Sequence, residues 1–276
     1  MLGSASSTMR DRASTTAEFV CLMRALGPDD PYAGRLLSRP LRRAERVWRR
    51  LDAFGVPVDA ATLGLRTLIN ARHRFIDEAL NDALAAGVSQ VVLLGAGLDA
   101  RPWRFADGLA GRTLFLVDHP ATAARRAART RRLPPVEARR VDVDFAREDF
   151  GDALLAAGFD PDRPAFFAWE GVSMYLDRAT VEAALRRLRA LCAPGAALAF
   201  DLWRPDAGGW PVRSVVALSR RGMALWGEPV RFGLPTAEVA TFVRAAGFEP
   251  ARVEVPAAGP WSGLTFVSAR PAPVPG

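Results

Sequence analysis

The chain has 276 residues, half of them apolar, which is enough to bury the core of one large domain or of one domain with a cap. Its formal charge of +7 and its isoelectric point of about 10.8 raise the question of a nucleic-acid partner. All 37 basic residues are arginine, however, and acidic residues are interspersed among them, so the charge indicates a compositional bias and we expect no nucleic-acid binding.

The first part of the chain is predicted to be helical. Residues 1–14 are small and polar, so we expect a disordered N-terminus without a secretory signal. Residues 15–88 show helical periodicity and no convincing strand, which predicts a helical cap. Its longest helix is expected at 61–86, with one apolar face made of Leu65, Leu68, Ile69, Phe75, Ile76 and Leu80.

An arginine cluster lies within the predicted cap. Its members fall largely along one helical stripe and are Arg39, Arg42, Arg43, Arg46, Arg49 and Arg50. A charge pattern alone does not identify a partner, so we interpret the stripe as a solvated helix face.

Residues 89–270 are predicted to form an α/β core. Strands are expected at 90–95, 113–118, 138–143, 164–169 and 196–201, and helices between them at 120–132, 147–157 and 178–192. Strands that alternate with helices indicate βαβ units and a parallel, Rossmann-like sheet.

The end of the core is predicted to differ from its beginning. Residues 205–234 are irregular and are interpreted as a substrate-side insertion, followed by a helix at 236–246. Two last strands, at 250–255 and 263–268, are joined by a segment too short for a helical crossover, so one of them must run antiparallel. The proline-rich residues 271–276 are expected to be a disordered tail.

A glycine turn and three acids mark the candidate site. The apolar strand that ends at Leu94 runs into Gly95-Ala96-Gly97, and later strands finish at Asp118, Asp144 and Glu170. Because ligands of open α/β sheets bind outside the carboxyl ends of the strands, these groups are expected to converge on one nucleotide-type site. Glycine in the turn would let the backbone approach a ligand closely.

The turn leaves two cofactors open. It matches Gly-x-Gly-x-x-Ala, and Asp118 lies about 20 residues further on, as in sites for nicotinamide dinucleotides. Asp99 inside the turn argues against a pyrophosphate at the helix N-terminus. S-adenosyl-L-methionine (SAM) carries no phosphate and has a cationic sulfonium, so the acid favours SAM.

Two of the acids have both a functional and a structural interpretation. Asp118 is expected to accept hydrogen bonds from two ribose hydroxyls, and its alternative role is a helix cap before Pro120. Asp144 is expected to accept from the adenine amino group, with Phe145 against the ring, and its alternative role is a cap for the 147–157 helix. Glu170 follows a wholly apolar strand, where it suits a sulfonium or an amino group.

Arg72 is unusual because it lies at the centre of the apolar face of the 61–86 helix. A charge in that position needs a partner. The structural interpretation is an internal ion pair with Glu78 or Asp118. The functional interpretation, which we favour, is a fork that binds the carboxylate of the cofactor's methionine.

These segments resemble the leucine carboxyl methyltransferase family of SAM-dependent enzymes, including its bacterial natural-product O-methyltransferases. The matching residues are Ala71-Arg72 with Phe75 and Asp77, Leu94 to Arg101 with Trp103-Arg104, Val117 to Pro120, Val143-Asp144, and Glu170 to Leu176. The resemblance implies the seven-stranded methyltransferase sheet with an antiparallel last strand. It also implies SAM contacts at Arg72, Gly95, Ala96, Gly97, Asp99, Asp118, His119, Asp144, Phe145 and Glu170.

The expected reaction is O-methylation of a small-molecule acceptor of secondary metabolism, with S-adenosyl-L-homocysteine as product. No metal site is expected, because the chain has only two cysteines and two histidines. A carboxylate acceptor needs no general base, whereas a hydroxyl acceptor usually does. Candidates for a base are scarce, namely His73 and His119, so a carboxylate is favoured over a hydroxyl. Glu170 and Tyr175 are the predicted catalytic residues. Acceptor contacts are predicted at Tyr175, Trp210, Arg213 and Trp226.

Two other functions remain open. One is a nicotinamide-dependent oxidoreductase, and the other is a SAM-binding protein that does not methylate. No run of 18 apolar residues predicts a membrane span, so a cytoplasmic protein with no membrane partner is expected. The sequence does not indicate an oligomeric state.

Overall fold

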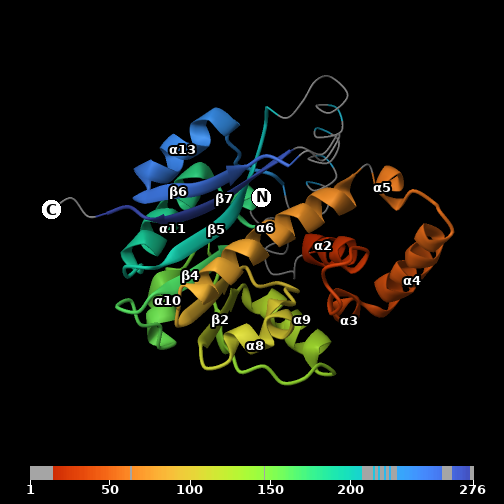
Figure 1. Ribbon diagram of the computed structural model, residues 1–276, viewed down its shortest axis with the longest axis horizontal. Helices are drawn as coiled ribbons and strands as arrows, with labels where there is room; N and C mark the ends of the chain where they lie inside the picture. The colour runs from red at the N-terminus through yellow and green to blue at the C-terminus, as the bar shows by residue number, and fades with distance from the viewer. Residues whose placement is uncertain are drawn as a thin grey trace, which may run out of the picture.

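A computed structural model describes residues 15–62, 64–145, 147–206, 229–256 and 263–273, together with the single residues 214, 217, 221 and 224. Within these residues one sheet of seven strands runs in the order β3-β2-β1-β4-β5-β7-β6 (Figure 1). The strands are β1 Gln90–Leu94, β2 Thr113–Asp118, β3 Arg139–Asp142, β4 Ala165–Trp169, β5 Ala197–Trp203, β6 Phe248–Glu254 and β7 Leu264–Pro271. Five strands are parallel, and β7 pairs antiparallel with both β5 and β6. The predicted fold class and the final hairpin are confirmed.

The strands at the centre of the sheet are apolar throughout because both of their faces are covered. Every residue of β1 and of β4 is buried. Such continuous apolar runs are typical of parallel strands between two helical layers. One face of the sheet is covered by α10 Phe150–Ala156, α11 Arg178–Ala190 and α13 Thr236–Ala245 (Figure 1). The other face is covered by α6 Leu65–Ala85 and α8 Ala106–Leu109.

The N-terminal helices form a group beside the sheet, on the side of α6 (Figure 1). They are α2 Thr15–Ala25, α3 Ala33–Leu36, α4 Arg39–Ala53 and α5 Val58–Ala61. Their apolar residues pack in a cluster of their own that also includes Leu98 and Trp103, which follow β1. The cap is therefore anchored directly on the loop after the first strand.

Helix α6 contains Arg72, and it begins four residues later than predicted. Gly64 precedes it with φ of +84°, a conformation that glycine adopts without strain. The predicted apolar face is buried, with Leu65 at its end half-buried. No described helix is both long enough and apolar enough to cross a membrane.

Two boundaries differ from the prediction for local reasons. Helix α10 begins at Phe150 and not at 147, because the Asp149 carboxylate caps it by accepting from the amides of Gly151 and Asp152. Strand β7 continues to Pro271, and the Ala272 amide donates to the Gly247 carbonyl at 2.9 Å. Pro271 therefore belongs to the sheet, and Ala272 is hydrogen-bonded beside it, so neither lies in a disordered tail. Residues 1–14 and most of the predicted insertion lie outside the described residues.

Candidate active site

The carboxyl ends of four strands bring the candidate groups to one edge of the sheet. Strand β1 leads into the glycine turn, β2 ends at Asp118, Glu170 follows β4, and Asp201 lies in β5. Asp201 is fully buried and was not singled out from the sequence. The same rule that selected the other acids would have found it, because the strand predicted at 196–201 ends on this residue.

The glycine turn is shaped by protein contacts on both sides. Gly95 and Gly97 have φ of +66° and +44°. A Cβ on Gly95 would lie 2.3 Å from Cγ2 of Val172, so the space beside this glycine is filled by a side chain of the protein. A Cβ on Gly97 would lie 3.7 Å from the Cβ of Ala17, so α2 lies directly over the turn.

Asp118 joins the turn to the second strand. Its Oδ2 accepts from the Gly97 amide at 2.5 Å, and its Oδ1 accepts from the His119 amide at 2.7 Å. Each carboxylate oxygen can accept more than one hydrogen bond, so capacity for a ligand hydroxyl remains. Burial raises the pKa of Asp118 to about 6 despite these amides.

The helix after Asp118 is capped by its neighbour. The Nδ1 atom of His119 accepts from the Ala121 amide at 3.2 Å, at the start of α9 Pro120–Thr130. The alternative interpretation of Asp118 as that cap is therefore wrong, and the imidazole of His119 already serves the helix.

Asp144 and Phe145 lie at the end of β3. The Asp144 amide donates to Glu148 at 2.8 Å, and its carboxylate lies 3.6 Å from Nε of Arg147. Because Asp149 caps α10, the interpretation of Asp144 as the helix cap is wrong. The half-buried ring of Phe145 packs on Phe150 with centroids 5.4 Å apart. The adenine contacts of Asp144 and Phe145 stay a prediction.

Glu170 is the centre of a buried ionic network. Its Oε1 lies 3.1 Å from Nε of Arg72, and its Oε2 lies 2.8 Å from Nη1 of Arg101 and 3.1 Å from Nδ1 of His73. Burial by itself would raise the pKa of Glu170, but Arg101, His73 and Arg72 hold that pKa well below its usual range. The carboxylate is therefore ionised throughout the neutral range.

Arg72 forms internal ion pairs, but not with the predicted partners. Besides Glu170, it reaches Oδ2 of Asp201 with Nη1 at 3.4 Å. Glu78 pairs instead with Arg252 at 2.6 Å, so the predicted pair with Glu78 is wrong. The predicted pair with Asp118 is also wrong, because the Asp118 carboxylate is hydrogen-bonded to the two backbone amides described above.

Asp201 contacts both Arg72 and the loop that follows β4. Its Oδ1 accepts from the Gly171 amide at 2.6 Å. Gly171 has φ of +67°, and a Cβ there would lie 3.2 Å from Nη1 of Arg72. Glycine at this position therefore allows the guanidinium to lie against the backbone that follows Glu170.

A second arginine neutralises the acid inside the turn. The Nη1 atom of Arg101 lies 2.7 Å from Oδ2 of Asp99, and its Nε lies 2.7 Å from Oδ1 of Asp77. Arg104 donates to the other oxygen of Asp77 at 2.5 Å. Since Asp99 is paired, its repulsion of a phosphate is weaker than the sequence alone suggests. The family resemblance includes Arg101 and Arg104 but implies no role for either.

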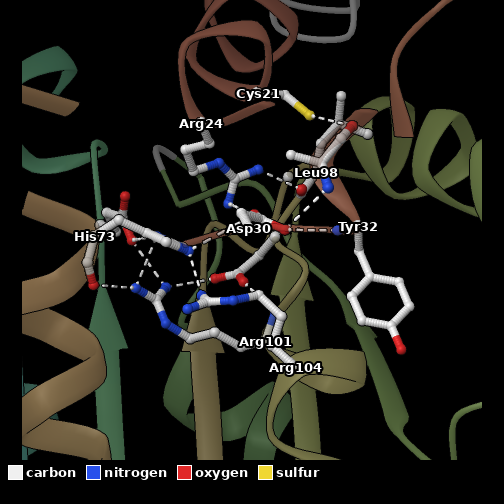
Figure 2. A network of polar contacts seen from close by, with 12 residues as sticks. Cys21, Arg24, Asp30, Tyr32, His73, Leu98, Arg101 and Arg104 are labelled. Atoms are coloured by element: carbon white, nitrogen blue, oxygen red, sulfur yellow. Dashed lines mark hydrogen bonds and ion pairs between the residues drawn. The ribbon is translucent and has the colours of Figure 1, made fainter. Parts of the chain in front are cut away.

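His73 is enclosed by this network. Its Nε2 lies 2.7 Å from Nη1 of Arg104, and its Nδ1 lies 3.0 Å from Nη2 of Arg101 (Figure 2). Nδ1 also lies 3.1 Å from Oε2 of Glu170. Guanidinium groups only donate, so Nε2 accepts from Arg104, whereas Nδ1 faces a donor in Arg101 and an acceptor in Glu170. Burial and Arg101 lower the pKa of His73.

Two further arginines hold the glycine turn from outside. Arg24 reaches in from α2 and donates to the Leu98 carbonyl at 2.6 Å (Figure 2). Arg126 in α9 donates to the Gly97 carbonyl at 3.0 Å, and its guanidinium lies 5.3 Å from the ring centre of Trp103. Sequence reasoning missed both, because no local pattern shows which backbone carbonyl a distant arginine will contact.

The connected ion pairs contain more acids than bases. They join four arginines, His73 and five carboxylates, so with a neutral imidazole the network has a formal charge of −1. Its charged members are Arg24, Arg72, Arg101, Arg104, Asp30, Asp77, Asp99, Glu170 and Asp201. In the described part of the chain, no three His, Cys, Asp or Glu residues are grouped so that they could hold a metal ion.

Only one of the predicted acceptor residues can be placed. Tyr175 ends the short 3-10 helix η1 Ser173–Tyr175, which follows Glu170. Its phenol is close enough to Arg72 to interact with it electrostatically. The Met174 carbonyl accepts from the Arg231 amide at 2.8 Å, so the end of the predicted insertion docks on η1. Trp210, Arg213 and Trp226 lie outside the described residues.

A family model, relatives in sequence and a solved structure match the chain. The model of the family described as leucine carboxyl methyltransferase matches residues 23–189. A Mycobacterium avium protein is 33% identical over 88% of this chain and 83% of its own length, and a Mycobacterium tuberculosis protein is 37% identical over 67% and 65%. Both are named "Putative S-adenosyl-L-methionine-dependent methyltransferase". A "putative methyltransferase" from Thermobifida fusca shares the fold, with a TM-score of 0.63 and 16% identity over 95% of this chain and 96% of that one.

Proposed function

Because the chain belongs to the leucine carboxyl methyltransferase family, we propose that it transfers a methyl group from SAM to a carboxylate of a small-molecule acceptor and releases S-adenosyl-L-homocysteine. The relatives are named as SAM-dependent, which disfavours the nicotinamide alternative. The single observation that carries the choice of a cationic cofactor is the excess of carboxylate in the buried network beside the glycine turn.

The residues at the strand ends fit SAM. Asp118 is fixed by two backbone amides and keeps acceptor capacity for the ribose hydroxyls. Glu170 is ionised, and it stabilises positive charge near it without a proton transfer. When bound, SAM supplies a methyl group already activated by a positively charged sulfur.

Arg72 is positioned to bind the carboxylate of the cofactor's methionine. Glu170 and Asp201 hold its guanidinium from two sides, so its orientation is set before a ligand arrives. A preorganised fork loses less entropy when it forms hydrogen bonds. Asp201 is thus a positioning residue for Arg72, and it also fixes the loop at Gly171.

A carboxylate acceptor agrees with the state of the two histidines. The His73 ring is buried between Glu170 and Arg104, and the His119 ring caps α9. Neither is available to remove a proton from an alcohol or a phenol. A carboxylate is ionised at neutral pH and needs no base, so the chain has only to hold it in line with the methyl group. Positioning alone can supply about 7–11 kcal/mol of a displacement barrier.

The acceptor is proposed to lie against Tyr175 and the insertion, with Trp210 and Trp226 as aromatic walls and Arg213 as the partner of its carboxylate. Replacing Arg213 with Ala should raise the Michaelis constant for the acceptor. An unchanged value would remove Arg213 from the acceptor site.

The acceptor class is tested with SAM that carries a labelled methyl group and a panel of carboxylic acids matched to phenols of the same skeleton. Methyl esters release labelled methanol in mild base, whereas methyl ethers do not. The proposal expects base-labile label with acids only. Base-stable label would show O-methylation of a hydroxyl. SAM binding without transfer to any panel member would favour a non-methylating role.

A further inference from the structure

A cavity lined by arginines lies away from the candidate active site. It is formed by α3, α4 and the end of α9, and its volume is about 430 Å³. Leu37, Ala128 and Leu133 supply apolar lining. All the charged residues that line it are basic: Arg35, Arg39, Arg42, Arg129, Arg131 and Arg132.

Most of these charges have no acidic partner in the structure. Arg129 pairs with Glu18 at 2.8 Å. Arg42 donates to the backbone carbonyls of Gly34 and Leu37, which fastens α3 to α4 but leaves its charge uncompensated. The remaining four, Arg35, Arg39, Arg131 and Arg132, form no ion pair with any residue that the structure describes.

The arginine-rich composition alone does not account for this cavity. A second cavity, of about 310 Å³, is also lined by arginines, Arg178 and Arg186, but there Glu182 and Glu238 line it as well. Glu182 pairs with both arginines. The first cavity lacks any such acid. Like charges held together without a counter-ion repel each other, so an anion would relieve the cost.

We propose that the cavity between α3, α4 and the end of α9 binds a ligand through a diphosphate group. Guanidinium forks match phosphate oxygens in pairs of hydrogen bonds. One phosphate monoester carries about −1.5 to −2 at neutral pH, which five uncompensated guanidinium groups exceed, whereas two linked phosphates match them better. A volume of about 430 Å³ suits a small molecule and is concave, unlike the surface that a bilayer or a duplex requires.

The cavity is separate from the methyl-transfer site. Helix α9 begins two residues after Asp118 and ends beside the cavity at Thr130. Its 11 residues, at about 1.5 Å each, place the two sites about 16 Å apart along the helix. The proposal therefore does not rest on the proposed function and can fail independently of it.

The test is calorimetric titration of the full chain with inorganic pyrophosphate, with orthophosphate and citrate as competing anions. The variant R39Q/R132Q removes two lining charges that form no ion pair with any described residue. The control R43Q/R50Q removes two exposed charges from the same helix α4, outside the cavity. We expect pyrophosphate binding to weaken at least about tenfold in the first variant and to stay unchanged in the control.

Several results would overturn the proposal. They are no binding of pyrophosphate, equal weakening in both variants, or binding of orthophosphate or citrate as tight as that of pyrophosphate. Tighter binding of duplex DNA or anionic phosphatidylglycerol vesicles, with both variants weakened alike, would show a general basic surface instead. If R39Q/R132Q does not fold, R35Q/R131Q removes two other lining charges and carries the same expectation.

Discussion

Glu170 offers a sharp test of the buried network because the chain contains a matched exposed carboxylate. Glu170 contacts Arg72 and Arg101, and Glu182 contacts Arg178 and Arg186, at similar distances. The Glu170 side chain is 11% exposed and that of Arg101 is 1% exposed, whereas Glu182 is 31% and Arg186 is 62% exposed. The two glutamates therefore differ chiefly in burial.

Replacement of each glutamate with Gln keeps the shape and removes the charge. In Glu170→Gln, two guanidinium groups lose their ionised acceptor in a buried site, and breaking a buried pair in this way costs about 3–5 kcal/mol. Glu182→Gln breaks exposed pairs, which are worth about 0.2–1 kcal/mol. At about 2–4 °C per kcal/mol, Glu170→Gln should lower the melting temperature by about 6–20 °C.

The assays are thermal and urea unfolding followed by circular dichroism, with both variants and the unaltered protein at one pH and ionic strength. Added salt should reduce the small effect of Glu182→Gln and leave the effect of Glu170→Gln nearly unchanged, because buried pairs are screened less. The reasoning is refuted if Glu170→Gln costs no more than Glu182→Gln, since the network would then be as hydrated as the surface.

Three further predictions concern the glycine turn, its acid and the thiols. Burial raises the pKa of Asp118 to about 6, and only the ionised form accepts ribose hydroxyls, so the affinity for S-adenosyl-L-homocysteine should fall about tenfold per pH unit below 6. A pH-independent affinity between pH 5 and 8 in calorimetry would contradict this. Gly95→Ala should lower the free energy of urea unfolding by about 2–5 kcal/mol, because residue 95 has a positive φ and a Cβ there meets Val172. Adding Val172→Ala to that variant should recover about 1–3 kcal/mol of the loss, and additive effects of the two substitutions would disprove the contact. Burial raises the pKa of Cys21 to about 11 and of Cys192 to about 12, so iodoacetamide at pH 8 should label both thiols only after unfolding. Rapid labelling of the folded chain would contradict this prediction.

Much of the sheet could be predicted because its strands carry a strong local signal. The wholly apolar runs at β1 and β4 and the short connection before β7 are properties of adjacent residues, and the structure reproduces them. The start of α10 was misplaced because Asp149, three residues inside the predicted helix, is the better cap.

The site was predicted less completely because its contacts are between distant parts of the chain. Arg72 was recognisable as a charge on an apolar face, yet its partners Glu170 and Asp201 lie 98 and 129 residues away. Periodicity places a residue on a face but does not show which strand end that face will meet. The family resemblance indicated which family the chain belongs to, and the family model confirms the family. The SAM contacts that the resemblance implies stay predictions.

The most direct test of a SAM site at the carboxyl edge is titration with S-adenosyl-L-homocysteine at pH 7.5. Asp118→Asn alters the proposed ribose acceptor, and Asp142→Asn is the control, because Asp142 lies opposite in β3 but is exposed and bound to Arg140. We expect micromolar binding, about −8 kcal/mol, to the unaltered chain and to Asp142→Asn, and at least about tenfold weaker binding to Asp118→Asn. Absence of binding, or equal binding to all three proteins, would contradict the account.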